Sequence, residues 1–130
     1  MKKQLNKLEE FNKAFKLGKT TNKPTLISKK EFILRFDLMK EENDEYLEAC
    51  KENDLTEIAD ALGDQLYILC GTILKHGLHH KIQEVFDEIH QSNMSKLEQD
   101  GNPIFREDGK VLKGENYFSP KINEILFITE

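Results

Sequence analysis

The sequence predicts an all-α protein, a four-helix bundle with an irregular C-terminal tail. Apolar residues recur at three- and four-residue spacing in four segments, two of which follow helix-capping pairs. Three of the seven glycines lie beyond Leu97, where the helical spacing ends. A chain of 130 residues has the length of one domain. We therefore expect a single domain over 1–130, with a helical core at about 3–97 and a glycine-rich tail at about 98–130.

The first two helices are predicted from their apolar faces and their ends. The first spans roughly four turns and ends at Gly18, because glycine favours helix C-termini. Its apolar face consists of Leu5, Leu8, Phe11 and Phe15. The second begins at Ser28, which has capping-box spacing to Glu31. Its apolar face consists of Phe32, Phe36, Met39, Tyr46 and Cys50.

The third and fourth helices are predicted in the same way. Asp54 and Glu57 form a second capping pair, so the third helix should run from about Leu55 to His76. Its apolar stripe consists of Ile58, Leu62, Leu66, Leu69 and Ile73. The fourth helix should run from about His80 to Leu97, with Ile82, Val85, Phe86 and Ile89 on its inner face. Because the connection before the third helix is short, the second and third helices should lie antiparallel.

The tail has a different character. "EDGK" between "PIFR" and "VLKG" indicates a tight turn and a small hairpin. The final "INEILFIT" is apolar, so we expect it to pack on the bundle or on a partner subunit.

Composition excludes several classes of function. The formal net charge of −5 argues against broad binding to nucleic acid polymers or anionic membranes. No apolar run is long enough to span a membrane, and the N-terminus does not resemble a signal peptide. Cys50 and Cys70 fall in helical patterns without metal-site spacing, so we expect core residues and no disulfide. These features favour a cytoplasmic protein.

The most unusual stretch is "EENDEYLEACKENDLTEIADALGD", residues 41–64, in which ten of 24 residues are acidic. Two interpretations compete: a solvated acidic surface, or carboxylates that point inward and hold a metal ion. Some acids continue apolar stripes, in the rows Leu34, Leu38, Glu41, Glu45, Ala49 and Glu57, Asp60, Asp64, Ile68, Gly71. Because inward-facing carboxylates repel one another and lose hydration, a hard cation such as Mg²⁺ would stabilise them.

These residues resemble the MazG-like superfamily of all-α nucleotide pyrophosphohydrolases. The family pattern is E-E-x-x-E on one helix and E-x-x-D on the next, and Glu41, Glu42 and Glu45 match the first half. By spacing, Glu57 and Asp60 match the second half. By context, the family aspartate is Asp64 before "QLYIL", and Ala61 then stands where an acid is expected. The tail "SNMSKLEQDGNPIFREDGKVLKGENYFSPKI" is similar to a segment of the phosphoribosyl-ATP pyrophosphohydrolase-like branch.

The resemblance implies Mg²⁺, with Mn²⁺ as a substitute, and a nucleoside triphosphate substrate attacked at its α-phosphorus. It implies Glu42, Glu45, Asp60 and Asp64 as metal ligands and Glu41 and Glu42 as catalytic residues, with Glu57 as a reserve ligand. Asn93 and Lys96 continue the inner stripe of the fourth helix and are candidates for substrate binding, as are Lys110 and Lys113 in the tail. Tyr117 and Phe118 could stack on a base, but core or dimer packing is favoured.

Three functions remain open from sequence. The first is a Mg²⁺-dependent nucleoside triphosphate pyrophosphohydrolase that removes non-standard or excess nucleotides. The second is phosphoribosyl-ATP hydrolysis in histidine synthesis, and the third is a non-enzymatic helical interaction module. We also expect a homodimer or higher homo-oligomer, because a bundle this small gains from extra burial and because relatives assemble in this way.

Overall fold

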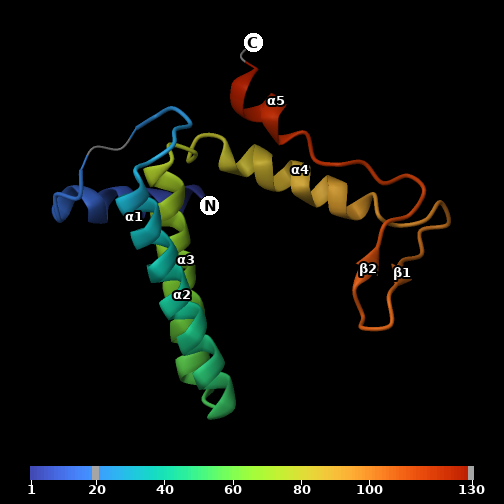
Figure 1. Ribbon diagram of the computed structural model, residues 1–130, viewed down its shortest axis with the longest axis horizontal. Coiled ribbons are helices and arrows are strands. Elements are labelled where there is room, and N and C mark those ends of the chain that lie inside the picture. The colour runs from blue at the N-terminus through green and yellow to red at the C-terminus, as the bar shows by residue number, and fades with distance from the viewer. Residues whose placement is uncertain (19–20, 129–130) are drawn as a thin grey trace. The chain divides into compact units, whose positions relative to one another are not determined.

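The computed structural model describes residues 1–18 and 21–128 and confirms the all-α fold class, with five helices and one short hairpin in these ranges (Figure 1). The chain divides into two compact units, Met1–His80 and Lys81–Glu130. The single domain over 1–130 and the four-helix bundle stay predictions.

The first unit contains helices α1 (Lys2–Ala14), α2 (Lys29–Lys51) and α3 (Leu55–Lys75). α2 and α3 lie side by side and antiparallel, as expected from their short connection (Figure 1). Near the middle of the pair, the Gln65 amide donates to Asn43 Oδ1 at 3.0 Å. Closer to the start of α2, Arg35 Nε donates to Thr72 Oγ1 at 3.0 Å. This pairing brings the end of α2 beside the beginning of α3.

Both predicted helix caps are present. Ser28 Oγ accepts the backbone N–H of Glu31 at 3.2 Å at the start of α2. The Asp54 carboxylate accepts the backbone N–H of Glu57 at 3.1 Å at the start of α3. These bonds satisfy N–H groups that have no partner within a helix, so they fix where each helix begins.

The core of the first unit is small. α1 packs on α3, with Phe11 against Tyr67 in an edge-to-face contact at 5.6 Å between ring centroids. Among the residues that the structure describes, the buried apolar ones all lie in this unit: Leu5, Leu8, Ala49, Ala61, Cys70, Ile73 and Leu74. Cys70 is fully buried, as expected of a core residue, whereas Cys50 is only half-buried; both are free. α1 ends earlier than predicted, at Ala14, because Lys16 already has a positive φ of 55°.

Gly77 follows the end of α3 and lies against the connector between α1 and α2. Its φ is +64°, and a Cβ at this position would lie 2.1 Å from the carbonyl oxygen of Lys23. Beside it, the Thr25 N–H donates to the carbonyl oxygen of His76, whose Nδ1–H donates to the carbonyl oxygen of Thr25. Glycine is therefore required here both by backbone conformation and by space.

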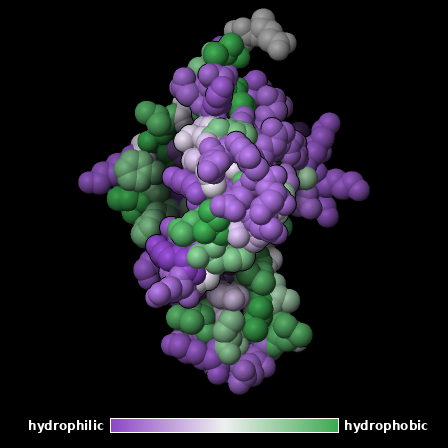
Figure 2. All heavy atoms as spheres, turned by 90° about the vertical axis from the view of Figure 1, so that its right-hand side faces the viewer, coloured by the Kyte–Doolittle hydropathy of each residue, from purple (hydrophilic) through white to green (hydrophobic). Residues whose placement is uncertain are grey.

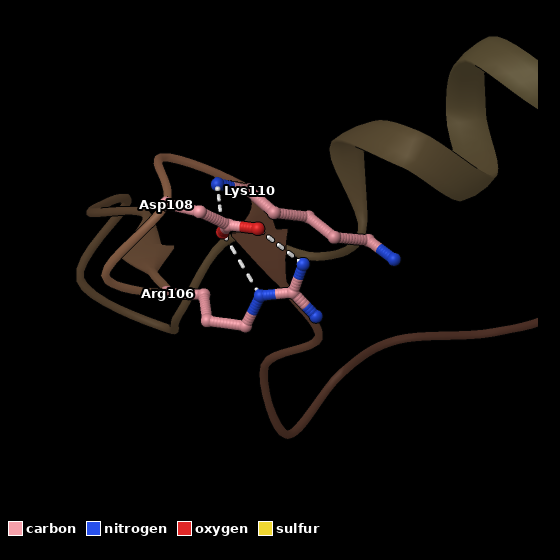
Figure 3. A network of polar contacts seen from close by, with 3 residues as sticks. All are labelled: Arg106, Asp108 and Lys110. Atoms are coloured by element: carbon pink, nitrogen blue, oxygen red, sulfur yellow. Dashed lines mark hydrogen bonds and ion pairs between the residues drawn. The ribbon is translucent and has the colours of Figure 1, made fainter.

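The second unit contains α4 (Ile82–Met94), β1 (Ile104–Phe105), β2 (Val111–Leu112) and α5 (Ile122–Phe127). The predicted hairpin is present, with β1 and β2 paired antiparallel. Its turn is closed by the Asp108 carboxylate, which accepts from the Arg106 guanidinium and from the backbone N–H of Lys110 (Figure 3). α4 is shorter at both ends than predicted, and α5 was not predicted as a helix.

Many large apolar side chains lie at the surface, and Figure 2 shows them interspersed with hydrophilic ones. Phe86, which was expected on the inner face of α4, is 63% exposed. None of the helices in the described ranges combines the length and the apolar character needed to cross a membrane.

Candidate metal centre

Three carboxylates from α2 and α3 converge on one point. One oxygen atom from each of Glu42, Glu45 and Asp64 can be chosen so that all three atoms lie within 4.8 Å of one another. Glu42 and Glu45 are one turn apart on α2, and Asp64 comes from the facing stretch of α3. The antiparallel pairing of two capped helices is therefore what assembles this cluster, called here the acid cluster.

The inward direction of Glu42 follows from its place on α2. Arg35, Glu42 and Ala49 are seven residues apart, so they share one face of the helix. Arg35 hydrogen-bonds α3, and Ala49 is buried, so this face points toward α3. The sequence analysis instead placed Glu41 and Glu45 on the inner row, in line with Leu34. Within that row, Ala49 is buried and Glu45 contributes an oxygen to the acid cluster, whereas Leu34 is 56% exposed and Glu41 is exposed.

Glu42 is the residue of the acid cluster whose charged form is clearly disfavoured. Its Oε2 atom is buried and has no hydrogen-bond partner. Loss of hydration is the main cause that raises the pKa of Glu42 to about 7. Hydrogen bonding to Glu45, and the negative charges of Glu45, Asp64 and Glu41, raise it further. In the absence of a cation, Glu42 therefore resists ionisation near neutral pH.

The cluster fits a divalent cation in its donor type, its charge and its size. Oxygen donors are those that Mg²⁺ and Mn²⁺ prefer. Two oxygens on opposite sides of one Mg²⁺ lie about 4 Å apart, so carboxylates this close suit a single ion. Glu42 Oε2 is a buried carboxylate oxygen without a hydrogen-bond partner. Such an atom needs a proton or a cation, so it directly supports a bound ligand at this point.

An open cavity of about 520 Å³ lies along the same helix pair. Its polar lining is almost entirely acidic, and its only lysine, Lys40, is already paired with Asp44 at 2.8 Å. Glu45 belongs both to this cavity and to the acid cluster. The lining residues are Asp37, Lys40, Glu41, Asp44, Glu45, Glu48, Ala49, Glu52, Glu57, Asp60 and Ala61.

The remaining acids of the sequence prediction lie in this cavity. Glu41, Asp60 and the reserve residue Glu57 line it, and they are not part of the three-carboxylate cluster. Asp60 lies one helical turn before Asp64, about 6 Å nearer the start of α3. Ala61, which stands where the family pattern has an acid, is buried and lines the same cavity.

The four candidate substrate-binding residues lie in the second unit. Asn93 is exposed on the last turn of α4, and Lys96 follows just after that helix. Lys110 lies in the hairpin turn, where its side chain extends away from Asp108 (Figure 3). Lys113 Nζ lies over the ring of Tyr117, 4.7 Å from its centroid. The structure thus pairs Lys113 with an aromatic residue that the sequence analysis expected to serve in packing.

Arg35 is a residue near the site that the sequence analysis missed. Its guanidinium is half-buried between the helices and donates to Thr72 Oγ1 and to the carbonyl oxygen of Ile68. Burial lowers the pKa of Arg35, and a Cβ on Gly71 would lie 2.8 Å from Arg35 Nη2. Its position in the sequence, seven residues or two helical turns before Glu42, was the signal that could have identified it. Arg35 ties α2 to α3 beside the acid cluster.

Comparisons with known proteins agree with this geometry. The model of the phosphoribosyl-ATP pyrophosphohydrolase family matches residues 8–93. An uncharacterized protein of Acanthamoeba polyphaga mimivirus is 34% identical over 92 residues, which cover 71% of this chain. The chain spans only 33% of the length of that relative. A crystal structure of a candidate NTP pyrophosphohydrolase from Exiguobacterium sp. 255-15 is similar with a TM-score of 0.50 and 25% identity, covering 92% of this chain and 90% of that one.

The antiparallel helix pair with its E-E-x-x-E stretch facing Asp64 defines the chain as a helical protein of the MazG-like superfamily. More specifically, the chain belongs to the phosphoribosyl-ATP pyrophosphohydrolase family, whose model matches about two thirds of its length. The matched range contains the whole acid cluster and ends before the hairpin.

Proposed function

We propose that the chain is a Mg²⁺-dependent nucleoside triphosphate pyrophosphohydrolase that converts its substrate to a nucleoside monophosphate and pyrophosphate. The observation that carries this proposal is the acid cluster with the unpartnered Oε2 of Glu42, on a helix pair inside the matched family range. Non-standard or excess nucleotides in the cytoplasm are the proposed substrates.

The negative charge of the cavity supports the participation of a cation in the reaction. A triphosphate is repelled by a cavity lined with eight carboxylates and one lysine that is already paired. Glu42, Glu45 and Asp64 would hold Mg²⁺, or Mn²⁺ in its place, with Asp60 as a further ligand. Bound there, the cation would neutralise charge on the phosphoryl oxygens and lower the pKa of bound water.

The carboxylates that remain in the cavity supply the proton chemistry. A water oxygen attacks the α-phosphorus, and the bond between that phosphorus and the oxygen bridging to the β-phosphate breaks. The water loses a proton to a carboxylate, and pyrophosphate leaves with the bridging oxygen. Glu41 is exposed and lines the cavity, so it is the proposed acceptor of this proton. Glu42 acts with it by orienting the water.

Phosphoribosyl-ATP is a second candidate substrate, because the family takes its name from hydrolysis of that compound. Its triphosphate carries the same α–β anhydride bond, so the same carboxylates would serve. In either case Asn93, Lys96, Lys110 and Lys113 are proposed to bind the substrate, the lysines through phosphate oxygens.

A homodimer or larger homo-oligomer is also proposed, because the helix pair leaves a row of large apolar side chains in solvent. Phe36 and Leu47 of α2, and Leu62 and Leu69 of α3, are each more than 40% exposed. A second copy of the chain would bury them, which matters for a unit with so few buried apolar residues.

The test is pyrophosphate release from a panel of nucleoside triphosphates and phosphoribosyl-ATP. With Mg²⁺ we expect at least one member to be hydrolysed, and the preferred member decides between the two substrates. Removal of the cation should abolish release. No release from any member, together with no effect of Mg²⁺ on thermal stability, would instead favour a helical interaction module.

A further inference from the structure

The tail segment from Lys113 to Ser119 is fastened to the end of α4. Ser92, the one buried polar residue among those described, donates from Oγ to the carbonyl oxygen of Phe118 at 2.7 Å. Ser95 Oγ accepts the backbone N–H of Phe118 at 3.1 Å. The N–H of Gly114 donates to the carbonyl oxygen of Lys96 at 2.9 Å. Three hydrogen bonds therefore hold this segment in a defined position.

Gly114 is what allows the close approach. A Cβ at this residue would lie 2.7 Å from the carbonyl oxygen of Lys96 and 3.0 Å from that of Leu97. Both are backbone atoms, which cannot turn aside as a side chain can. Any larger residue at position 114 would have to move the segment away from the end of α4.

This docking gathers two lysines around one tyrosine. The ammonium group of Lys113 lies 4.7 Å from the ring centroid of Tyr117, within cation–π range. A hydrogen bond with Ser119 lowers the pKa of Tyr117, and the positive charges of Lys113 and Lys96 lower it further. Lys96 is held beside Lys113 through the hydrogen bond between its carbonyl oxygen and the N–H of Gly114.

Neither of these two lysines forms an ion pair in the part of the chain that the structure describes. The ion pairs of the described residues are Lys40–Asp44, Lys51–Glu48 and Arg106–Asp108, none of which involves Lys96 or Lys113. Their nearest acids in sequence, Glu98 and Glu115, are exposed and form no ion pair in those ranges. Two ammonium groups from neighbouring segments, one of them over the Tyr117 ring, and neither in an ion pair among the described residues, match the donors that phosphate oxygens accept.

We propose that Lys96, Lys113 and Tyr117 form an oligophosphate site that binds linked phosphate groups in the absence of a metal ion. Two separate ammonium groups favour adjacent phosphates over a single one, because each can contact a different phosphate. Tyr117 serves mainly to hold Lys113, since the ammonium group already lies over its ring. The choice of ligand rests on the proposed function, in which these phosphates belong to the nucleotide or to the pyrophosphate product.

The test is calorimetric binding of inorganic tripolyphosphate to the full chain in metal-free buffer, with orthophosphate for comparison. We expect tripolyphosphate to bind more tightly than orthophosphate. Lys96→Ala and Lys113→Ala should each weaken tripolyphosphate binding about tenfold, as expected for loss of one charged hydrogen bond. Gly114→Ala should weaken it as well, because it displaces the segment. Lys121→Ala removes the same charge from an exposed position of the same unit and should have little effect.

Three results would overturn the proposal: no tripolyphosphate binding without metal, equal affinity for orthophosphate, or an equal loss in Lys121→Ala. Because Lys113 is exposed, its replacement should leave the fold intact, which far-ultraviolet circular dichroism checks. Glu45→Gln separates this inference from the proposed function. It should leave tripolyphosphate binding unchanged even though it is expected to lower hydrolysis at least about 100-fold.

Discussion

Glu45→Gln is expected to lower Mg²⁺-dependent pyrophosphate release at least about 100-fold, since loss of even an indirect partner of a metal ligand commonly costs 10- to 100-fold. Glu45 is the one residue that belongs both to the acid cluster and to the cavity. The substitution keeps the shape of the side chain and removes its charge. It should therefore weaken cation binding at the point where the substrate is expected to arrive.

Initial rates over a range of Mg²⁺ concentrations measure this effect. If Glu45 binds the metal ion, the Glu45→Gln protein should need a higher Mg²⁺ concentration to reach half of its maximal rate. A substitution that only disturbs the fold would not change that concentration. Glu10→Gln, the same chemical change at an exposed position of α1, is the matched control and should retain full activity. A Glu45→Gln protein with normal rates and a normal Mg²⁺ requirement would remove Glu45 from the site.

Glu42→Gln should raise the stability of the metal-free protein at pH 8 and abolish its stabilisation by Mg²⁺. In the unfolded chain a glutamate has a pKa near 4.5, whereas in the folded protein the pKa of Glu42 is about 7. Between these values the folded state binds more protons than the unfolded state, so the free energy of unfolding falls as pH rises from 4.5 to 7. For a side chain that is only half-buried, this loss is about 1–2 kcal/mol after allowance for solvent screening.

Thermal unfolding at pH 5 and pH 8, with and without Mg²⁺, measures both parts of this prediction. The wild-type protein should lose stability from pH 5 to pH 8 without metal and regain it with Mg²⁺, by about 2.7 kcal/mol at 100 times the dissociation constant. Glu42→Gln should show a smaller loss and no gain. Glu10→Gln should behave as the wild type does, and an equal Mg²⁺ response in Glu42→Gln would contradict the role of Glu42.

Local signals in the sequence were sufficient for much of the fold. Ser28 and Asp54 were recognised as caps because capping depends only on residues within one turn, and both cap bonds are present. The short hairpin could be predicted from its turn residues for the same reason. α5 was missed because it has only six residues and no side-chain cap, so no local signal defines it. The division into two units depends on tertiary contacts, which no local pattern records.

The acid cluster could be predicted in part. The family resemblance placed Glu42, Glu45 and Asp64 in one set of ligands, and the structure brings one carboxylate oxygen from each of them together. The row that contains Glu42 was not recognised, because Arg35 interrupts its apolar pattern and only the contact with α3 shows that it faces inward. The proximity of Lys113 and Tyr117 was also beyond sequence reasoning, since it depends on a tail segment docking through backbone hydrogen bonds.

The most direct test of the central claim is a crystal structure of the protein grown with Mn²⁺, in which anomalous scattering locates the ion. The claim predicts one peak within bonding distance of carboxylate oxygens from Glu42, Glu45 and Asp64, and no such peak in crystals of Glu45→Gln. A peak bound only by Glu57 and Asp60, or no peak on this helix pair at saturating Mn²⁺, would contradict it.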